Sequence, residues 1–167
     1  MDLGLHNGTH VVVRPVRSGD KALLAEGVAQ LSPHSARMRF LGPKPRLTTR
    51  ELRYLTEIDF VDHYALVAVW ADDPRRMAGV ARWVRSVEHH DAAELAILVA
   101  DELQGQGLGL ALGEALADAA RARGIARLTG IALTENAAAQ RLFAHLSSRL
   151  RTRFDGTTYE LVAELAA

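Results

Sequence analysis

The spacing of apolar residues along the chain changes between two periods, and each period predicts a type of secondary structure. Contiguous apolar runs and strict alternation predict strands, whereas apolar residues three and four positions apart predict helices. The predicted strands are Val11–Arg14, Tyr64–Trp70, Met77–Arg85, Ala93–Ala100, Ala126–Ile131, Leu150–Phe154 and Thr157–Leu165. The predicted helices run from Asp20 to about Leu31, over a short stretch from Thr48 or Thr49, from Leu108 to a stop near Gly124, and from Asn136 to about Leu146.

The order of these elements predicts the fold class. It is neither a strict strand–helix alternation nor an all-antiparallel pattern, and a mixed, mostly antiparallel sheet of about seven strands with helices on both faces satisfies it. The first helix is expected to be broken at Pro33, and Asp155-Gly156 predicts the turn of a closing hairpin. We therefore expect an α+β fold in a single domain over 1–167, with its core at about 9–165.

Composition and charge exclude several classes of protein. The 167 residues contain no cysteine, which rules out a disulfide scaffold, a cysteine nucleophile and a thiolate metal site. The 20 basic and 20 acidic side chains balance, which argues against nucleic acid as a partner. The longest apolar run, Ala65–Ala71, has seven residues and is too short to span a membrane, and the N-terminus lacks the pattern of a signal peptide. We expect a cytoplasmic protein without a membrane partner, and the sequence leaves monomer and homodimer open.

One region departs from this charge balance. Between Arg37 and Arg53 there are six basic residues and a single acid, Glu51. Charge runs are usually solvated surface. The alternative is an electrostatic funnel for an anionic ligand or an acidic peptide, with the proline-flanked Lys44 near the entrance to the site.

A glycine-rich loop joins a strand to a helix at Gln104–Gly109. This arrangement presents unpaired backbone N–H groups and the positive end of a helix dipole to a phosphate. The loop fails the Walker pattern and the dinucleotide fingerprint, because Leu110 stands where the first requires lysine and the second requires glycine. It fits Gln/Arg-x-x-Gly-x-Gly/Ala, with Gln104, Gly107 and Gly109 at the defined positions.

Together with the strand before it, this loop resembles the acyl-CoA loop of the GNAT superfamily of N-acetyltransferases. The resemblance extends to Asn136 at the start of the next helix. Nearer the N-terminus, Val13-Arg14-Pro15 and the stretch from Leu31 to Phe40 look like the protein-acetylating branch of that superfamily. The resemblance implies the GNAT fold, acetyl-CoA as the acyl donor and an amine acceptor, with a protein lysine among the candidates.

The chemistry of coenzyme A agrees with this resemblance. Its pyrophosphate requires successive backbone N–H groups, which Gln104–Leu110 can supply, and glycines let the backbone approach closely. Its pantetheine amides can pair with Ile97–Val99 like a short strand, provided that this strand splays from its neighbour. Asn136 is either a plain helix cap or a cap that also touches the cofactor. The candidate cofactor-binding residues are Ile97, Leu98, Val99, Gln104, Gly105, Gln106, Gly107, Leu108, Gly109, Asn136 and Phe143.

Glu94 is the candidate catalytic residue. It interrupts an apolar strand, where a carboxylate is costly unless it is solvated, paired or used. The resemblance implies that a glutamate at this position acts as general base through water, and that a backbone N–H near Leu98 stabilises the oxyanion. The alternative is that Glu94 lies on the exposed end of the strand and pairs with an arginine.

Phe143 departs from the family pattern, because many members have a tyrosine at this position that protonates the leaving thiolate. Tyr64 and Tyr159 are the candidate substitutes, although a tyrosine in a strand is more often packed. Water can also supply the proton, because a thiol pKa near ~8.5 makes the leaving group undemanding.

Two further polar groups have alternative interpretations. Asp59, Asp62 and His63 either bind a basic substrate or form a capped, solvated loop. His89-His90 suggests an exposed loop more strongly than a metal site, because adjacent residues in an extended chain point in opposite directions. No metal is expected.

The sequence thus predicts an acetyl-CoA-dependent N-acetyltransferase in which Glu94 assists direct attack by an amine. Two alternatives stay open. One is a non-catalytic acyl-CoA-binding or sensor module, which Phe143 favours; the other is an acetyltransferase for small-molecule amines.

Overall fold

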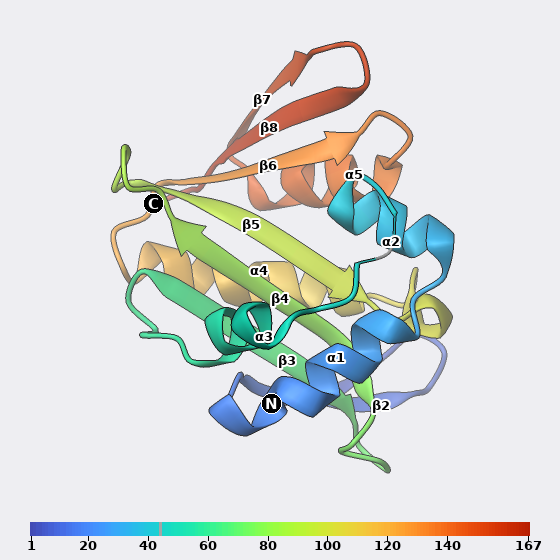
Figure 1. Ribbon diagram of the computed structural model, residues 1–167. Coiled ribbons are helices and arrows are strands. Elements are labelled where there is room, and N and C mark those ends of the chain that lie inside the picture. The colour runs from blue at the N-terminus through green and yellow to red at the C-terminus, as the bar shows by residue number, and fades with distance from the viewer. Residues whose placement is uncertain (44) are drawn as a thin grey trace.

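The computed structural model describes residues 1–43 and 45–167 and shows one twisted sheet between two layers of helices (Figure 1). The strands in the described ranges are β1 (Asp2–Gly4), β2 (His10–Pro15), β3 (His63–Trp70), β4 (Met77–Arg85), β5 (Ala92–Val99), β6 (Arg127–Leu133), β7 (Arg149–Phe154) and β8 (Thr158–Glu164). The α-helices are α1 (Lys21–Ala29), α2 (Pro33–Phe40), α3 (Thr49–Thr56), α4 (Leu108–Arg121) and α5 (Ala137–Leu146), and short 3₁₀ turns cover Ser18–Asp20 and Asp101–Leu103.

The sheet has the order β1-β2-β3-β4-β5-β6-β8-β7. Each neighbouring pair is antiparallel except β5 and β6, which are parallel. The expectation of a mixed, mostly antiparallel sheet is therefore confirmed. The expected number of about seven strands is one too few, because the three-residue β1 is too short to show any periodicity and forms only by pairing with β2.

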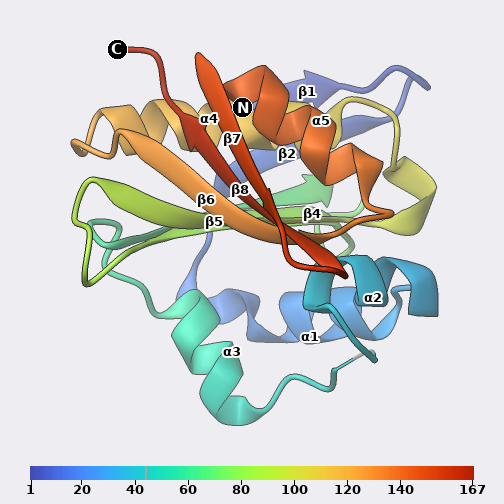
Figure 2. The same cartoon turned by 90° about the horizontal axis from the view of Figure 1, so that it is seen from above.

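The two faces of the sheet are covered by different helices. In Figure 2, α4 and α5 lie on one face and α1, α2 and α3 lie on the other. Trp83, which is fully buried, packs on the α4 face and donates its indole N–H to the carbonyl oxygen of Leu116 at 3.1 Å. On the opposite face, Leu24 and Val28 of α1 pack with Val67 in a second apolar cluster.

Helix α2 is not among the predicted helices. The sequence predicts a first helix to about Leu31 that is broken at Pro33, whereas α1 ends at Ala29 and Pro33 begins a new helix. The Ser32 hydroxyl accepts the backbone N–H of Ser35 at 3.1 Å and caps this helix. A proline without an N–H is tolerated in the first turn, where that N–H would have no partner within the helix. Pro33 therefore starts a helix instead of preceding a loop.

Strands β5 and β6 pair over only three positions, Ala92–Glu94 with Arg127–Thr129. Beyond Glu94, β5 continues along β4 as far as Val99, whereas β6 continues along β8 as far as Leu133. The two strands diverge because each follows its antiparallel partner. The splay that was expected beside Ile97–Val99 is present.

We predict that Gly79→Ala destabilises the fold. A Cβ at Gly79 of β4 would lie 2.9 Å from the carbonyl oxygen of Leu98 and 3.3 Å from side chains of Leu108 and Leu112. Because a backbone atom cannot move aside cheaply, the unfolding free energy should fall by about 1–3 kcal/mol. Urea unfolding measures this change. Gly19→Ala is the control, since no atom lies within 4 Å of its Cβ position, and it should change the free energy by less than ~0.5 kcal/mol; equal stability of both variants would contradict the prediction.

Candidate active site

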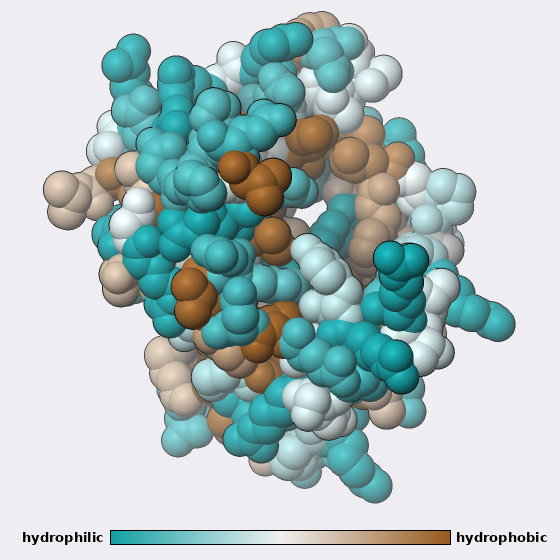
Figure 3. Space-filling view, turned by 60° about the vertical axis from the view of Figure 1, so that its left-hand side comes forward, coloured by the Kyte–Doolittle hydropathy of each residue, from teal (hydrophilic) through white to brown (hydrophobic). Residues whose placement is uncertain are grey.

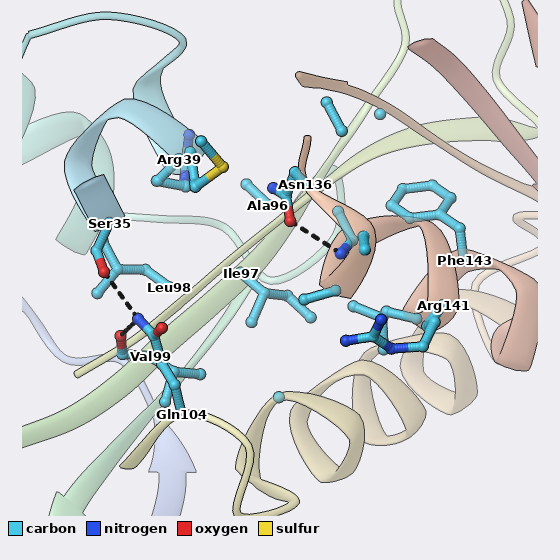
Figure 4. A pocket seen from close by; sticks show the side chains of 18 of the residues that line it. Ser35, Arg39, Ala96, Ile97, Leu98, Val99, Gln104, Asn136, Arg141 and Phe143 are labelled. Carbon is cyan, nitrogen blue, oxygen red and sulfur yellow. Dashed lines mark hydrogen bonds between the residues drawn. The ribbon is translucent and has the colours of Figure 1, made fainter. Parts of the chain in front are cut away.

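A cavity of about 860 Å³ opens where β5 and β6 separate. Its walls come from α2, β5, the glycine loop, β6 and the start of α5. Figure 3 shows the hollowed surface, with hydrophobic side chains gathered at its rim, and Figure 4 shows the side chains that point into it. Of the residues predicted as site residues, those that line the cavity are Glu94, Ile97, Leu98, Val99, Gln104, Gly105, Gly107, Gly109, Asn136 and Phe143.

The edge of β5 presents backbone groups to this cavity. Ala100 donates its N–H to the carbonyl oxygen of Ala78, and Ser86 donates its N–H to the carbonyl oxygen of Ala92. The backbone groups of Ala92 and Ala100 therefore face β4. By alternation, the backbone groups of Leu98 face β4, whereas those of Ile97 and Val99 face the gap. The N–H groups of Ile97 and Val99 are therefore the candidates for the predicted oxyanion donor near Leu98. Their role in catalysis stays a prediction.

The glycine loop meets the N-terminus of α4. Gly107 has φ 96° and occupies the N-cap position, a left-handed conformation that favours glycine. The first-turn N–H groups of a helix have no partner within the helix and are available to an anion. Gln106 and Leu108 do not line the cavity: the Gln106 carbonyl accepts the His6 N–H at 3.1 Å, and the Leu108 side chain is fully buried in the core. Their predicted contribution is thus restricted to backbone groups.

A hydrogen-bond network ties α2 to the end of β5. The Asp101 carboxylate accepts the Ser32 N–H at 2.9 Å and the Ser32 hydroxyl at 2.7 Å, and it also accepts the Ser35 hydroxyl. The amide of Gln104 donates to the Ser35 hydroxyl at 2.9 Å and to the Val99 carbonyl at 3.1 Å (Figure 4). Burial acts to raise the pKa of Asp101, but these hydrogen bonds outweigh it and hold that pKa below its ordinary value. The network fixes α2 over the cavity.

This network escaped sequence reasoning, as did the cavity residues of α2. The available signal was the serine before Pro33 with a second serine three positions later, which is an N-cap pattern. The partner, Asp101, lies 69 positions from Ser32. No local pattern connects residues at that separation.

Asn136 and Phe143 belong to the far wall of the cavity. The Asn136 side-chain oxygen accepts the Ala139 N–H at 3.1 Å, so the predicted cap is present (Figure 4). The ring of Phe143 is buried against β6: a Cβ at Gly130 would lie 2.6 Å from it. Phe143 therefore has a packing role at this wall and carries no proton to donate.

Glu94 lies at the inner end of the gap, on the last pair between β5 and β6, opposite Thr129. Its side chain is exposed, and in the described residues no arginine, lysine or histidine forms an ion pair with it. Of the alternative interpretation, the exposed position of Glu94 is confirmed, whereas the expected pairing with an arginine is not found in the described residues. Its charge acts on Arg39 of α2: burial lowers the pKa of Arg39, and the charge of Glu94 offsets part of that shift.

Neither candidate substitute for the missing tyrosine lies at the cavity. Tyr64 stacks on Trp83 at 5.7 Å, with the guanidinium of Arg123 4.5 Å from its ring. Tyr159 packs against Phe154 at 5.5 Å. Both are packed aromatic side chains, and the described part of the cavity wall contains no tyrosine.

The Asp59–His63 segment forms a capped turn. The Asp59 carboxylate accepts the backbone N–H groups of Val61, Asp62 and His63 at 2.9, 2.9 and 3.0 Å, which lowers its pKa. Asp62 pairs with Arg85 at 2.7 Å. None of these residues lines the cavity, which supports the interpretation as a structural loop.

The basic stretch divides between two places. Arg39 lines the cavity, and Arg37 pairs across it with Glu135. Arg50 and Arg53 are exposed on α3. The expected position of Lys44 near the entrance falls outside the residues that the structure describes. In the described residues, no group of three histidine, aspartate or glutamate side chains is arranged to hold a metal ion, and none of the helices is long and apolar enough to cross a bilayer.

Comparison with known proteins identifies the family. Residues 34–147 match the Acetyltransferase (GNAT) family. The chain belongs to this family. It is an acyltransferase with the GNAT fold.

Individual relatives agree. The chain is 33% identical over 135 residues to the acetyltransferase PA5475 of Pseudomonas aeruginosa, covering 80% of this chain and 72% of that protein. It is 31% identical over 147 residues to the acetyltransferase Pat of Mycolicibacterium smegmatis, covering 86% of this chain but only 43% of that protein. The chain thus spans less than half of Pat.

Two solved structures show the same fold. The GNAT domain of S. lividans PAT has a TM-score of 0.87 at 30% identity and covers 99% of this chain and 96% of that chain. The structure of yncA from Salmonella typhimurium, solved with its cofactor acetyl-CoA, has a TM-score of 0.68 at 20% identity and covers 93% and 92% of the two chains.

We predict that Asp101→Asn loosens α2 in a pH-dependent way. Because the folded pKa of Asp101 is lower than the ordinary 3.8, its ionised form stabilises the fold above that pH, and the contribution disappears as pH falls through the folded pKa. At pH 7 the variant should lose about 1–3 kcal/mol of unfolding free energy, the range for hydrogen bonds to a charged group. The difference should shrink below pH ~4.

Urea unfolding of both proteins at pH 7 and pH 3 measures this difference. Asp118→Asn is the control, because Asp118 is an exposed partner of Arg121 on α4, and exposed pairs contribute little at either pH. A deficit of the Asp101 variant that is equal at both pH values would contradict the prediction.

Proposed function

We propose that this enzyme is an acetyl-CoA-dependent N-acetyltransferase, in which Glu94 assists direct attack of an amine on the thioester. The single observation that carries the proposal is the gap between β5 and β6, with the glycine loop at one end and Glu94 at the other. The yncA structure with acetyl-CoA supports the choice of acyl donor.

The residues around the gap fit the parts of acetyl-CoA in order. The pyrophosphate requires N–H donors and a positive helix end, which the loop and the first turn of α4 provide. The pantetheine amides require strand-like partners, and the backbone groups of Ile97 and the N–H of Val99 have no strand beside them in the described chain. The Val99 carbonyl is already bonded to Gln104. The acyl group then reaches the inner end of the gap, at Glu94.

The chemistry requires a neutral amine. A lysine amine with a pKa near ~10.4 is about three units from neutrality at pH 7.4, so its deprotonation costs about 4 kcal/mol. Glu94 can take that proton directly or through water. The amine nitrogen bonds to the carbonyl carbon, an N–H of β5 stabilises the oxyanion, and the C–S bond breaks. The thiolate takes its proton from water, since Phe143 has none.

The acceptor we propose is a lysine side chain of a protein. The resemblance of Val13-Arg14-Pro15 and of the stretch from Leu31 to Phe40 to the protein-acetylating branch of the superfamily supports this choice over a small-molecule amine. The family membership argues against the non-catalytic alternative, which would leave Glu94 without a use.

We predict that Gly109→Glu weakens cofactor binding without unfolding the protein. Gly109 lies in the first turn of α4 and lines the cavity, and a Cβ there meets only ordinary contact with Val99 at 3.7 Å. A carboxylate in this turn suits the helix dipole but repels a pyrophosphate. Coenzyme A should bind about tenfold or more weakly than to the matched neutral variant Gly109→Gln. Thermal shift and calorimetry measure this; equal affinities would remove the phosphate assignment.

We predict that Glu94→Gln lowers turnover by about 10²–10³-fold, the scale of general-base removal. The affinity for coenzyme A should be unchanged, because glutamine preserves the size of the side chain. Released thiol measures turnover with an amine acceptor, and Glu88→Gln, an exposed glutamate between β4 and β5, is the control. Full activity of the Glu94 variant would show that Glu94 is not the base.

A further inference from the structure

Arg39 lines the active-site cavity and has no hydrogen-bond partner among the residues that the structure describes. It lies on α2 (Figure 4), is half-buried, and lines the same cavity as Glu94, whose charge acts on it. In residues 1–43 and 45–167, its guanidinium makes no hydrogen bond or ion pair; its contact is the ring of the adjacent Phe40 at 4.9 Å. Five donors are therefore directed at the cavity without an acceptor.

A second guanidinium adds to this positive charge. Arg82 on β4 is buried and donates to the carbonyl of Leu55 at 3.0 Å and to Nε2 of His63 at 2.8 Å. Burial and the charge of Arg39 lower the pKa of Arg82 to about 10, with the nearby Tyr54 acting to raise it. Burial and Arg82 lower the pKa of His63 to about 4, so His63 is neutral at pH 7.

The charges around Arg39 do not balance. Arg39 interacts electrostatically with two charged groups, the guanidinium of Arg82 and the carboxylate of Glu94, and in the described residues it forms an ion pair with no carboxylate. Partly buried charge is costly unless it is paired, and arginine matches a carboxylate with two parallel hydrogen bonds. An acceptor that carries a carboxylate could compensate the charge of Arg39 with that group. An amine on the same acceptor could then reach Glu94.

The surface beyond Glu94 continues this pattern. Glu94, Thr129, Val162 and Arg151 are direct neighbours on one face across β5, β6, β8 and β7. Three strand spacings separate the ends of this row by roughly 14 Å, the reach of a few extended residues. Along β7, Arg149, Arg151 and Arg153 are exposed on this face, with only Glu160 and Glu164 as weak partners, at 3.7 and 3.4 Å. The row is open to a peptide and has more basic than acidic side chains.

We propose that Arg39 is the residue that recognises the acceptor, by binding a carboxylate that flanks the acceptor lysine in the same peptide. The acceptor class is then a protein segment in which Asp or Glu lies within a few residues of the lysine. This inference rests on the proposed N-acetyltransferase function. Arg39, which belongs to the basic stretch between Arg37 and Arg53, would thus recognise an acidic peptide.

Paired peptides test this proposal. Each is a capped alanine heptapeptide with one central lysine and a glutamate at one of the other positions, and its twin has glutamine there. Calorimetry with coenzyme A bound measures affinity without turnover, and released thiol with acetyl-CoA measures kcat/KM. In the wild-type enzyme, at least one glutamate peptide should bind about ten- to hundredfold more tightly than its twin, the range for a charge-assisted contact.

The variants assign this preference to Arg39. In Arg39→Gln the glutamate peptide and its glutamine twin should bind with equal affinity. Arg39→Lys should keep part of the preference for the glutamate peptide, because lysine keeps the charge but cannot form two parallel hydrogen bonds. Arg53→Gln, which removes an exposed charge from α3, is the control and should keep the full ratio. The ratio within one variant is insensitive to general damage, because damage weakens both twins alike.

Several results would overturn the proposal. These are twins that bind equally, the absence of binding by any peptide, and an Arg39→Gln variant that weakens both twins by the same factor. If the enzyme prefers Nα-acetyl-lysine, which has a free α-carboxylate, over its methylamide, and shows no preference among the peptides, then Arg39 recognises the carboxylate of a small-molecule acceptor. Faster transfer from succinyl-CoA that is lost in Arg39→Gln would assign Arg39 to the acyl group. Acetylation of n-propylamine reports on the proposed function separately, so an acceptor preference can fail while the enzyme assignment stands.

Discussion

The divergence of β5 from β6 is the constraint on which the rest of the site depends. The two strands share three pairs; beyond these, β5 continues along β4 for five pairs and β6 continues along β8 for four. Antiparallel pairing is slightly more stable per residue than parallel pairing. The divergence leaves one edge of β5 without a strand, and buried backbone groups need partners. In the proposed function, the amides of the pantetheine arm supply these partners.

Helix α2 is fastened beside this gap by a network of hydrogen bonds. Asp101 holds the N-terminus of α2 through Ser32 and Ser35, and Gln104 connects that cap to the carbonyl of Val99. The strand, the glycine loop and α2 are thus one connected unit. Because α2 brings Arg39 to the cavity, this network also determines which charge faces the acceptor.

Electrostatics separates two ends of the active site. At the end proposed to bind the pyrophosphate, the positive potential comes from backbone N–H groups and the dipole of α4. At the acceptor end it comes from the side chains of Arg39 and Arg82. Arg82 is held by Leu55 and His63 and connects α3 to the sheet, whereas Arg39 remains available to a ligand. Arg82 therefore has a structural role, whereas Arg39 has the proposed role in recognition.

The amino-acid sequence by itself determined the order of most elements, the glycine loop, the Asn136 cap and the isolation of Glu94 in an apolar strand. Each of these depends on residues within a few positions of one another, where periodicity and capping rules apply. Tertiary structure alone decided the rest. Strand β1 exists only through its pairing with β2, and the cap of α2 is tied to the end of β5 because Asp101 binds Ser32. Phe143 packs on Gly130, and Arg39 comes to face Glu94, through contacts between distant segments. Such contacts leave no periodic trace in the chain, because a side-chain hydrogen bond or ion pair depends on where two segments meet in space and not on their spacing in sequence.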